Sequence, residues 1–123
     1  MWREVLERAP ELAKRVAINE TVGPRLLDEL AVWPDPEVRK WVSDHPRVWL
    51  KTLDRLAVDA DPSVRRRAVY NARLSNQMLR KLRYDSDPEV SAEASRRLTA
   101  RAYVERLLND PEWWRHLGNS EIA

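Results

Sequence analysis

The chain has 123 residues, of which 43% are hydrophobic and 34% charged, with a formal net charge of +2 and no cysteine. The lack of cysteine excludes disulfides, thiolate catalysis and cysteine-ligated zinc or iron–sulfur clusters. No apolar run approaches the roughly 18 residues of a membrane span, and the N-terminus lacks the apolar core of a signal peptide. We therefore expect one soluble, cytoplasmic domain with no membrane partner.

An Asp-Pro pair recurs along the chain with a fixed period. Asp35-Pro36, Asp61-Pro62 and Asp87-Pro88 are equally spaced, Pro10 precedes Pro36 by the same interval, and Asp110-Pro111 arrives early. An Asp side chain caps free backbone N–H groups, and Pro at the first helical position loses no hydrogen bond. Each copy therefore predicts the start of a helix in a repeat array.

The expected elements follow in chain order. A leading helix forms an N-terminal cap over 1–8, four two-helix units occupy 9–34, 35–60, 61–86 and 87–109, a C-terminal capping helix covers 110–118, and 119–123 is a tail. In each unit the first helix has two apolar residues one turn apart, and the second helix of the first three units has a pair of leucines. These predicted core positions are Leu12/Val16, Val38/Val42, Val64/Ala68 and Val90/Ala94, then Leu27/Leu30, Leu53/Leu56 and Leu79/Leu82.

The fourth unit and the two ends depart from this pattern. Residues 95–102 contain no Gly, Pro or Asn, so the two helices of the fourth unit are expected nearly to merge. Trp2 and Trp113 fall at the ends of the array, where we expect them to seal the core.

A two-helix unit this short cannot close a core alone, so neighbouring units must stack. The motifs are Asp-Pro-x-Val-Arg at Asp35 and Asp61, Val-Ala-x-Asn at 16–19 and Leu-Leu-x-x-Leu-Ala at 26–31. Over residues 9 to 110 they resemble the variant leucine-rich repeat, a relative of HEAT-like helical repeats. The resemblance implies a curved superhelix of short helices, some of them 3₁₀ turns, and no activity. The predicted fold is all-α: a short right-handed α-solenoid of about four 26-residue two-helix repeats with terminal caps, one domain.

Arg39 and Arg65 follow the apolar position of the Asp-Pro-x-Val-Arg motif. In proteins similar to HEAT repeats, arginine at this place ties adjacent units together through a carboxylate, and the alternative is that it binds an anionic partner. We expect the structural role. The candidate acceptors are Asp59, Asp61 and Asp87, and His45 is expected to be a turn residue.

Basic residues form a predicted ridge over successive helices. Between Ser63 and Arg106 there are 11 basic and 5 acidic residues. A row of cations along stacked helices can follow a phosphate backbone, and the alternative is a solvated face balanced by nearby carboxylates. The candidate binding residues in this ridge are Lys40, Arg66, Arg67, Arg80 and Lys81.

Three tryptophans, Trp33, Trp41 and Trp49, lie outside the predicted core positions. A partly exposed tryptophan offers a large apolar area with one N–H donor, as binding hot spots do. The alternative is that the three rings pack on each other or on arginine stems.

No Gly-rich phosphate loop, Gly-x-Ser-x-Gly elbow or metal-ligand cluster is present, so we predict neither catalysis nor a cofactor. The leading hypothesis is a non-catalytic helical-repeat module that binds a protein partner through Trp33, Trp41 and Trp49. The alternative is nucleic-acid binding through the basic ridge with a tryptophan stacked on a base. A third hypothesis is a homodimer through the tryptophan edge.

Overall fold

The computed structural model describes residues 2–118, with side chains described for 4–115. The expected tail over 119–123 and the predicted sealing role of the Trp2 side chain lie outside these residues. Within them the chain is all-helical and contains no strand, which confirms the predicted all-α class. The helices are α1 (Trp2–Arg8), α2 (Glu11–Ile18), α3 (Pro24–Leu30), α4 (Pro36–Asp44), α5 (Leu50–Ala57), α6 (Pro62–Tyr70), α7 (Asn76–Leu82), α8 (Pro88–Asn109) and the 3₁₀ helix η1 (Trp113–Gly118).

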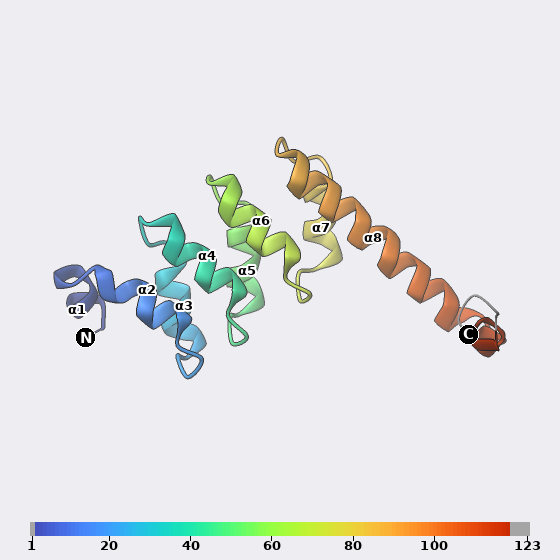
Figure 1. Cartoon of the computed structure of the whole chain (residues 1–123), viewed down its shortest axis with the longest axis horizontal. Coiled ribbons are helices and arrows are strands. Elements are labelled where there is room, and N and C mark those ends of the chain that lie inside the picture. Colours follow the sequence, from blue (N-terminus) through green and yellow to red (C-terminus); the bar gives the residue numbers. More distant parts are fainter. Residues whose placement is uncertain (1, 119–123) are drawn as a thin grey trace.

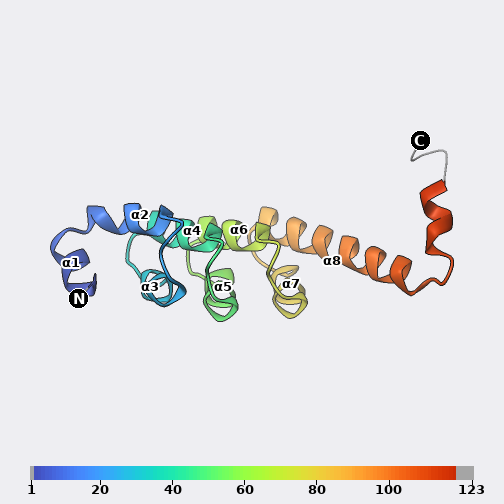
Figure 2. The ribbon, with the colours of Figure 1, turned by 90° about the horizontal axis from the view of Figure 1, so that it is seen from below.

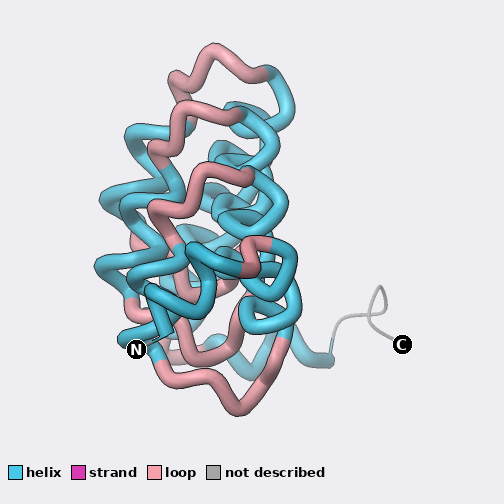
Figure 3. Tube along the Cα trace, turned by 90° about the vertical axis from the view of Figure 1, so that its left-hand side faces the viewer, coloured by secondary structure: helices cyan, strands magenta, loops and turns pink. Residues whose placement is uncertain are grey.

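The helices form two rows. Helices α2, α4, α6 and α8 make one row, and α3, α5 and α7 lie along one side of it (Figure 2). Helix α4 packs on α2 and α6, α6 packs on α8, and α5 and α7 pack on α6 and α8 respectively. The pairs follow one another along the long axis from α1 to η1 (Figure 1). In a view along that axis the connecting loops repeat at similar positions, each displaced from the one before (Figure 3).

The Asp-Pro motif starts helices as predicted. The side chain of Asp35 accepts a hydrogen bond from the Glu37 N–H (2.9 Å), and Asp61 accepts one from Ser63 (2.8 Å). Asp87 caps α8 by accepting from the Val90 N–H. Helix α2 begins after Pro10 without a side-chain cap, because Ala9 stands where the other copies have aspartate.

The core is a continuous line of apolar side chains between the two rows. The predicted apolar pairs on α4, α6 and α8 are at most 1% exposed, and the leucine pairs of α3, α5 and α7 are at most 3% exposed. Leu12 and Val16 on α2 are only partly buried. The core positions predicted from the repeat period are therefore buried, except at the N-terminal end.

His45 is a buried turn residue, as expected. Its Nδ1 atom accepts a hydrogen bond from the Arg47 N–H (3.0 Å), so the ring proton lies on Nε2, which donates to the Asn19 carbonyl (2.8 Å). Asn71, at the equivalent position of the next repeat, also bonds back to the preceding helix pair, through the carbonyl of Ser43 in the last turn of α4 (2.8 Å). Each of these two turns is thus hydrogen-bonded to the preceding helix pair.

The two helices expected in the fourth unit merge completely into α8. Its buried residues, Val90, Glu93 and Ala94, all lie in its first half, and the second half continues beyond α7 (Figure 1). The prediction that Trp113 seals the core is wrong, because its side chain is 43% exposed. The straight path of α8 carries η1 away from the core, so Trp113 has no end face to cover.

Among the described helices, none combines the length and the apolar character needed to cross a membrane. Over the same residues, no group of three His, Cys, Asp or Glu side chains is placed to hold a metal ion.

Candidate binding surfaces

Arg39 and Arg65 form equivalent ion pairs in successive repeats. Arg39 donates from Nε and Nη2 to Asp59 (2.9 and 3.1 Å), and Arg65 donates in the same way to Asp85 (2.9 and 3.1 Å). All four side chains are at most 15% exposed. Paired parallel hydrogen bonds of this kind fix geometry as well as adding energy. Both arginines are therefore structural.

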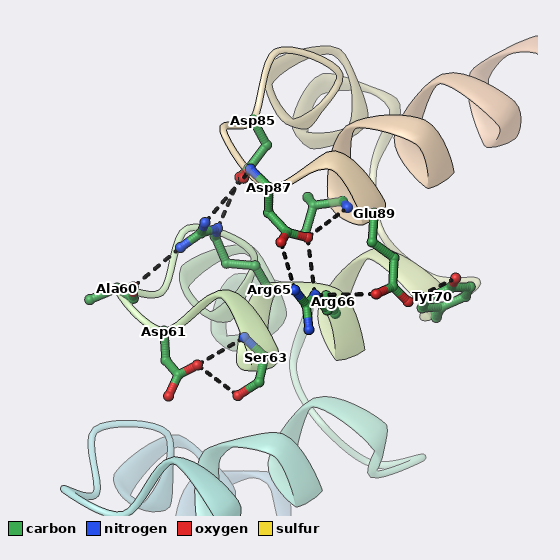
Figure 4. A network of polar contacts seen from close by, with 10 residues as sticks. Ala60, Asp61, Ser63, Arg65, Arg66, Tyr70, Asp85, Asp87 and Glu89 are labelled. Atoms are coloured by element: carbon green, nitrogen blue, oxygen red, sulfur yellow. Dashed lines mark hydrogen bonds and ion pairs between the residues drawn. The ribbon is translucent and has the colours of Figure 1, made fainter.

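Of the three predicted acceptors, Asp59 is correct, whereas Asp61 and Asp87 accept from neither Arg39 nor Arg65. Asp61 caps α6, and Asp87 accepts from Arg66 (Figure 4). The spacing explains the difference: each arginine reaches the aspartate 20 residues ahead, in the loop before the next capping aspartate.

Each of these arginines also donates to the loop before its own helix. Arg39 Nη1 bonds the Trp33 carbonyl (2.6 Å) and the Pro34 carbonyl (2.9 Å), and Arg65 Nη1 bonds the Asp59 carbonyl (2.8 Å). One guanidinium thus joins two successive loops. Four of the five N–H donors of each guanidinium are already used, and its charge is paired with an aspartate, so we do not assign either residue to an anionic ligand.

Three of the five predicted basic-ridge residues are also paired. Lys40 lies 2.5 Å from Glu37, and Arg67 lies 2.6 Å from Asp44. Arg66 forms two hydrogen bonds with Asp87 (2.7 and 3.0 Å) and lies 3.3 Å from Glu89 (Figure 4).

The contact between Arg66 and Asp87 shifts the pKa of both side chains. Hydrogen bonding to Arg66 is the main reason that the pKa of Asp87 falls to about 2, and its capping bond from the Val90 N–H acts in the same direction. The same pair raises the pKa of Arg66.

Arg80 and Lys81, the other two predicted cations, are exposed on α7 and have no ion-pair partner among the described side chains. The basic ridge is thus interrupted by carboxylates of α4 and of the start of α8.

The three candidate tryptophans do not form one cluster. Trp33, in the loop before α4, is partly buried and packs against the core. Trp49 immediately precedes α5, and Lys51 Nζ lies 4.6 Å from its ring centroid. The loops that hold Trp33 and Trp49 lie at opposite ends of α4, a helix of nine residues and about 13 Å. Trp41 lies on α4 itself and is 37% exposed.

Trp33 takes the place of an ion pair. It stands one repeat before Asp59, the acceptor of Arg39, and Ala13 stands one repeat before Arg39. The first helix pair therefore has Ala13 and Trp33 where the next has an arginine and an aspartate. Because Trp33 packs against the core, it fills space at a structural position.

Two features escaped prediction from sequence. Glu93 is only 6% exposed and accepts hydrogen bonds from Arg96 (2.5 and 2.9 Å) and Arg97 (3.1 Å). Hydrogen bonding to Arg96 is the largest cause of its lowered pKa. Arg97 also donates to the Tyr70 carbonyl (2.6 Å). The i,i+3 and i,i+4 spacings of these charges were a usable signal.

The second missed feature is a groove of about 910 Å³ on α2 and α3. Its lining combines apolar side chains, which the sequence had assigned to the core or left unassigned, with charged and polar ones. Helix α1 directly precedes α2 and contacts it, but no residue of α1 lines the groove. Its lining includes Leu12, Arg15, Val16, Val22, Arg25 and Leu26.

The fold and these surfaces define an all-helical protein whose successive helix pairs are joined by side-chain ion pairs and loop hydrogen bonds. Comparison with protein-family models, curated proteins and solved structures gave no match.

Proposed function

We propose that the chain is a right-handed α-solenoid of about four 26-residue repeats, similar to variant leucine-rich repeats, and that it acts as a non-catalytic module that binds a protein partner. The recurrence of the Arg39–Asp59 pair as Arg65–Asp85 supports the repeat interpretation. Such folds present an extended surface over several units, and binding by extended surfaces is their usual role.

The observation that carries the proposal is the exposure of Trp41. This ring is 37% exposed on α4, at a position whose equivalents in the preceding and following repeats are arginines, Arg15 and Arg67. An exposed tryptophan surrounded by polar groups has the composition of a protein-binding hot spot. Trp49 supplies a second, half-buried ring that is already covered by Lys51. We therefore assign the central anchor to Trp41, with Trp49 next to it in rank and Trp33 in a structural role.

The ion pairs favour a protein over a nucleic acid. A phosphate backbone is bound by unpaired cations in a row. Lys40, Arg66 and Arg67 each contact a carboxylate of their own chain, so binding phosphates would require breaking those contacts. Mixed charges around an aromatic anchor instead suit the polar rim of a protein interface.

Nucleic-acid binding is the second candidate, and one observation favours it. Arg80 and Lys81 are exposed on α7, and the neighbouring Arg83 lies 5.4 Å from the Tyr84 ring, which is 81% exposed. Cations next to an exposed aromatic ring can engage a single strand.

Site-specific photo-crosslinking tests the protein-binding proposal. A photoreactive phenylalanine analogue at position 41 should crosslink one defined protein in an extract of the source cells. The same analogue at position 84 serves as the control, because Tyr84 is more exposed but far along the chain from Trp41. Equal crosslinking from both positions would contradict a Trp41-centred surface. Anisotropy titrations with labelled single- and double-stranded oligonucleotides test the second candidate, for which binding should weaken steeply with salt.

A further inference from the structure

The chain has an apolar groove at one end and an uncovered apolar helix face at the other. The N-terminal groove is the surface of α2 and α3 lined by Leu12, Arg15, Val16, Val22, Arg25 and Leu26. The C-terminal helix face is the side of α8 that carries Ala100, Val104, Glu105 and Leu108. The two surfaces lie at opposite ends of the long axis, so they cannot meet within one molecule (Figure 1).

The N-terminal groove consists of positions that are buried wherever another helix pair precedes them. Leu12, Val16, Val22 and Leu26 are partly buried. Their equivalents in the next repeat, where α2 and α3 come before them, are at most 1% exposed; these are Val38, Val42, Val48 and Thr52. Helix α1 does not fill the groove, since its Leu6 and Glu7 border a different cavity near Trp33. The groove is therefore an open packing surface for a helix.

The C-terminal helix face carries apolar residues that none of the described helices covers. Val104 and Leu108 are the equivalents, one repeat later, of Met78 and Leu82, which are 8% and 3% exposed, yet Val104 and Leu108 are 51% and 69% exposed. The cause is the straight path of α8, which carries these residues past α7 (Figure 2). Exposed apolar side chains grouped on one face mark an interaction surface.

The charges at the two ends are complementary. Arg15 is the equivalent, two repeats earlier, of Arg67, which reaches back to Asp44 of the preceding first helix. Arg15 thus occupies a position from which this chain pairs with a carboxylate of a preceding helix. Arg15 and Arg25 beside the groove, and Glu105 on the C-terminal helix face, form no ion pair among the described residues.

Two other charged residues, Arg101 and Glu29, border these surfaces and do not prevent Glu105 from pairing with Arg15. Arg101, next to Glu105, is already bonded to the Leu74 and Ala72 carbonyls, so it is held away from a partner. Glu29 also borders the groove, whose lining keeps an excess of one positive charge. Glu105, the carboxylate of the helix face, can thus meet a groove with a net positive charge, while the Arg101 guanidinium is directed to the Leu74 and Ala72 carbonyls of its own chain.

We propose that the N-terminal groove of one copy of this chain binds the C-terminal half of α8 from a second copy. Val104 and Leu108 of one copy pack on Val16 and Leu26 of the next, and Glu105 pairs with Arg15. The contact joins two different surfaces, so it leaves one groove and one helix face open and adds further copies head to tail. It involves none of the candidate tryptophans and stands apart from the proposed protein-binding function.

Sedimentation velocity of the full chain tests the proposal. The wild type should form species larger than a dimer as its concentration rises from micromolar towards millimolar. Leu26→Glu and Val104→Glu should each sediment as monomers alone. An equimolar mixture of the two should give a 1:1 dimer and nothing larger, because one intact groove meets one intact helix face. Val58→Glu is the matched control, since Val58 is 58% exposed and lies on neither surface, and it should assemble as the wild type does.

Exchanging the charges of residues 15 and 105 distinguishes a lost contact from a variant that does not assemble because it does not fold. Arg15→Glu and Glu105→Arg should each weaken assembly at least several-fold, and the chain that carries both should regain it, because residue 15 of one copy meets residue 105 of the next. A monomeric wild type at all concentrations would overturn the proposal. So would a symmetric dimer abolished by only one of Leu26→Glu and Val104→Glu, or a double charge variant no better than the single ones.

Discussion

Arg65 and Asp85 form a two-pronged ion pair that connects the first turn of α6 to the loop before α8. Asp85 Oδ1, which accepts from Arg65 Nη2, also accepts from the Asp87 N–H (2.8 Å), and Asp87 in turn caps α8 (Figure 4). Arg39 and Asp59 show the same arrangement one repeat earlier, where Asp59 accepts from the Asp61 N–H (2.9 Å). The arginine, the loop aspartate and the capping aspartate therefore act together to place one helix relative to the next.

Replacing Arg65 tests this structural role. Arg65→Met leaves Asp85 partly buried without its charged donor, and we expect the free energy of unfolding to fall by about 1–3 kcal/mol. Arg65→Lys should recover little of it, because one ammonium cannot make both parallel bonds. Urea denaturation gives the values. Arg80→Met, an exposed control on α7, should change stability by less than about 0.5 kcal/mol. Equal effects of the Arg65 and Arg80 substitutions would contradict the structural role.

Replacing Trp33 should lower the stability of the fold, whereas replacing Trp41 should lower binding to the partner. Trp33→Ala removes a ring that packs against the core, so unfolding should become easier by about 1–3 kcal/mol. Trp41→Ala removes a ring that is 37% exposed, and stability should change by less than about 1 kcal/mol. Thermal and urea unfolding check both values. Loss of photo-crosslinked or captured partner with Trp33→Ala alone would show that the anchor has been assigned to the wrong tryptophan.

The Arg66–Asp87 pair predicts an acid-dependent stability. The pKa of Asp87 is lowered from 3.8 to about 2, mainly by hydrogen bonds from Arg66. A carboxyl group whose pKa is lower in the folded state stabilises the fold above pH 3.8, and that contribution disappears as the pH falls towards 2. We therefore expect Arg66→Met to be less stable than the wild type at pH 7, by a margin that shrinks between pH 4 and pH 2.

Urea unfolding at a series of pH values measures this margin. NMR titration of the Asp87 carboxyl carbon provides a direct check, because its pKa should rise in Arg66→Met. Arg80→Met should show no pH-dependent difference from the wild type over this range. A constant margin for Arg66→Met from pH 7 to pH 2 would rule out the linkage.

The sequence predicted those features that local chemistry determines. The Asp-Pro helix starts and most buried positions follow from capping and from apolar spacing, which act within a few residues. The choice of Asp85 rather than Asp87 as the acceptor of Arg65 depends on how adjacent helix pairs are displaced, which spacing alone does not give. The same holds for the paired state of Arg66 and Arg67, since their acceptors lie 21 and 23 residues away. The missing turn residues led us to expect that the two helices of the fourth unit would nearly merge, and the structure has them as the single helix α8.

The earlier turns each contain a hydrogen bond that α8 lacks, and we attribute the continuity of α8 to its absence. After the first helix of each earlier pair, a side-chain acceptor holds the N–H two residues ahead: Asn19 holds Thr21 (2.9 Å), His45 holds Arg47 (3.0 Å) and Asn71 holds Arg73 (2.9 Å). The next equivalent position is Arg97, whose side chain has no acceptor. With no turn to stabilise, the helix continues.

Restoring the acceptor should break α8. We predict that copying residues 71–75 onto 97–101, by Arg97→Asn, Leu98→Ala, Thr99→Arg, Ala100→Leu and Arg101→Ser, ends the helix near residue 96. A second helix should then begin near residue 102, as in the earlier pairs, and Val104 and Leu108 should pack against α7. NMR Cα chemical shifts should lose their helical values over 97–101, and the amide of Val104 should exchange more slowly with solvent. The matched control keeps Arg97 and carries the other four substitutions. The hydroxyl that Arg101→Ser introduces is equivalent to that of Ser75, which caps α7 by accepting from the Met78 N–H, but nothing at position 97 accepts from the residue 99 N–H, so the control should remain helical. If the full graft stays helical through 97–101, the missing acceptor is not what makes α8 continuous.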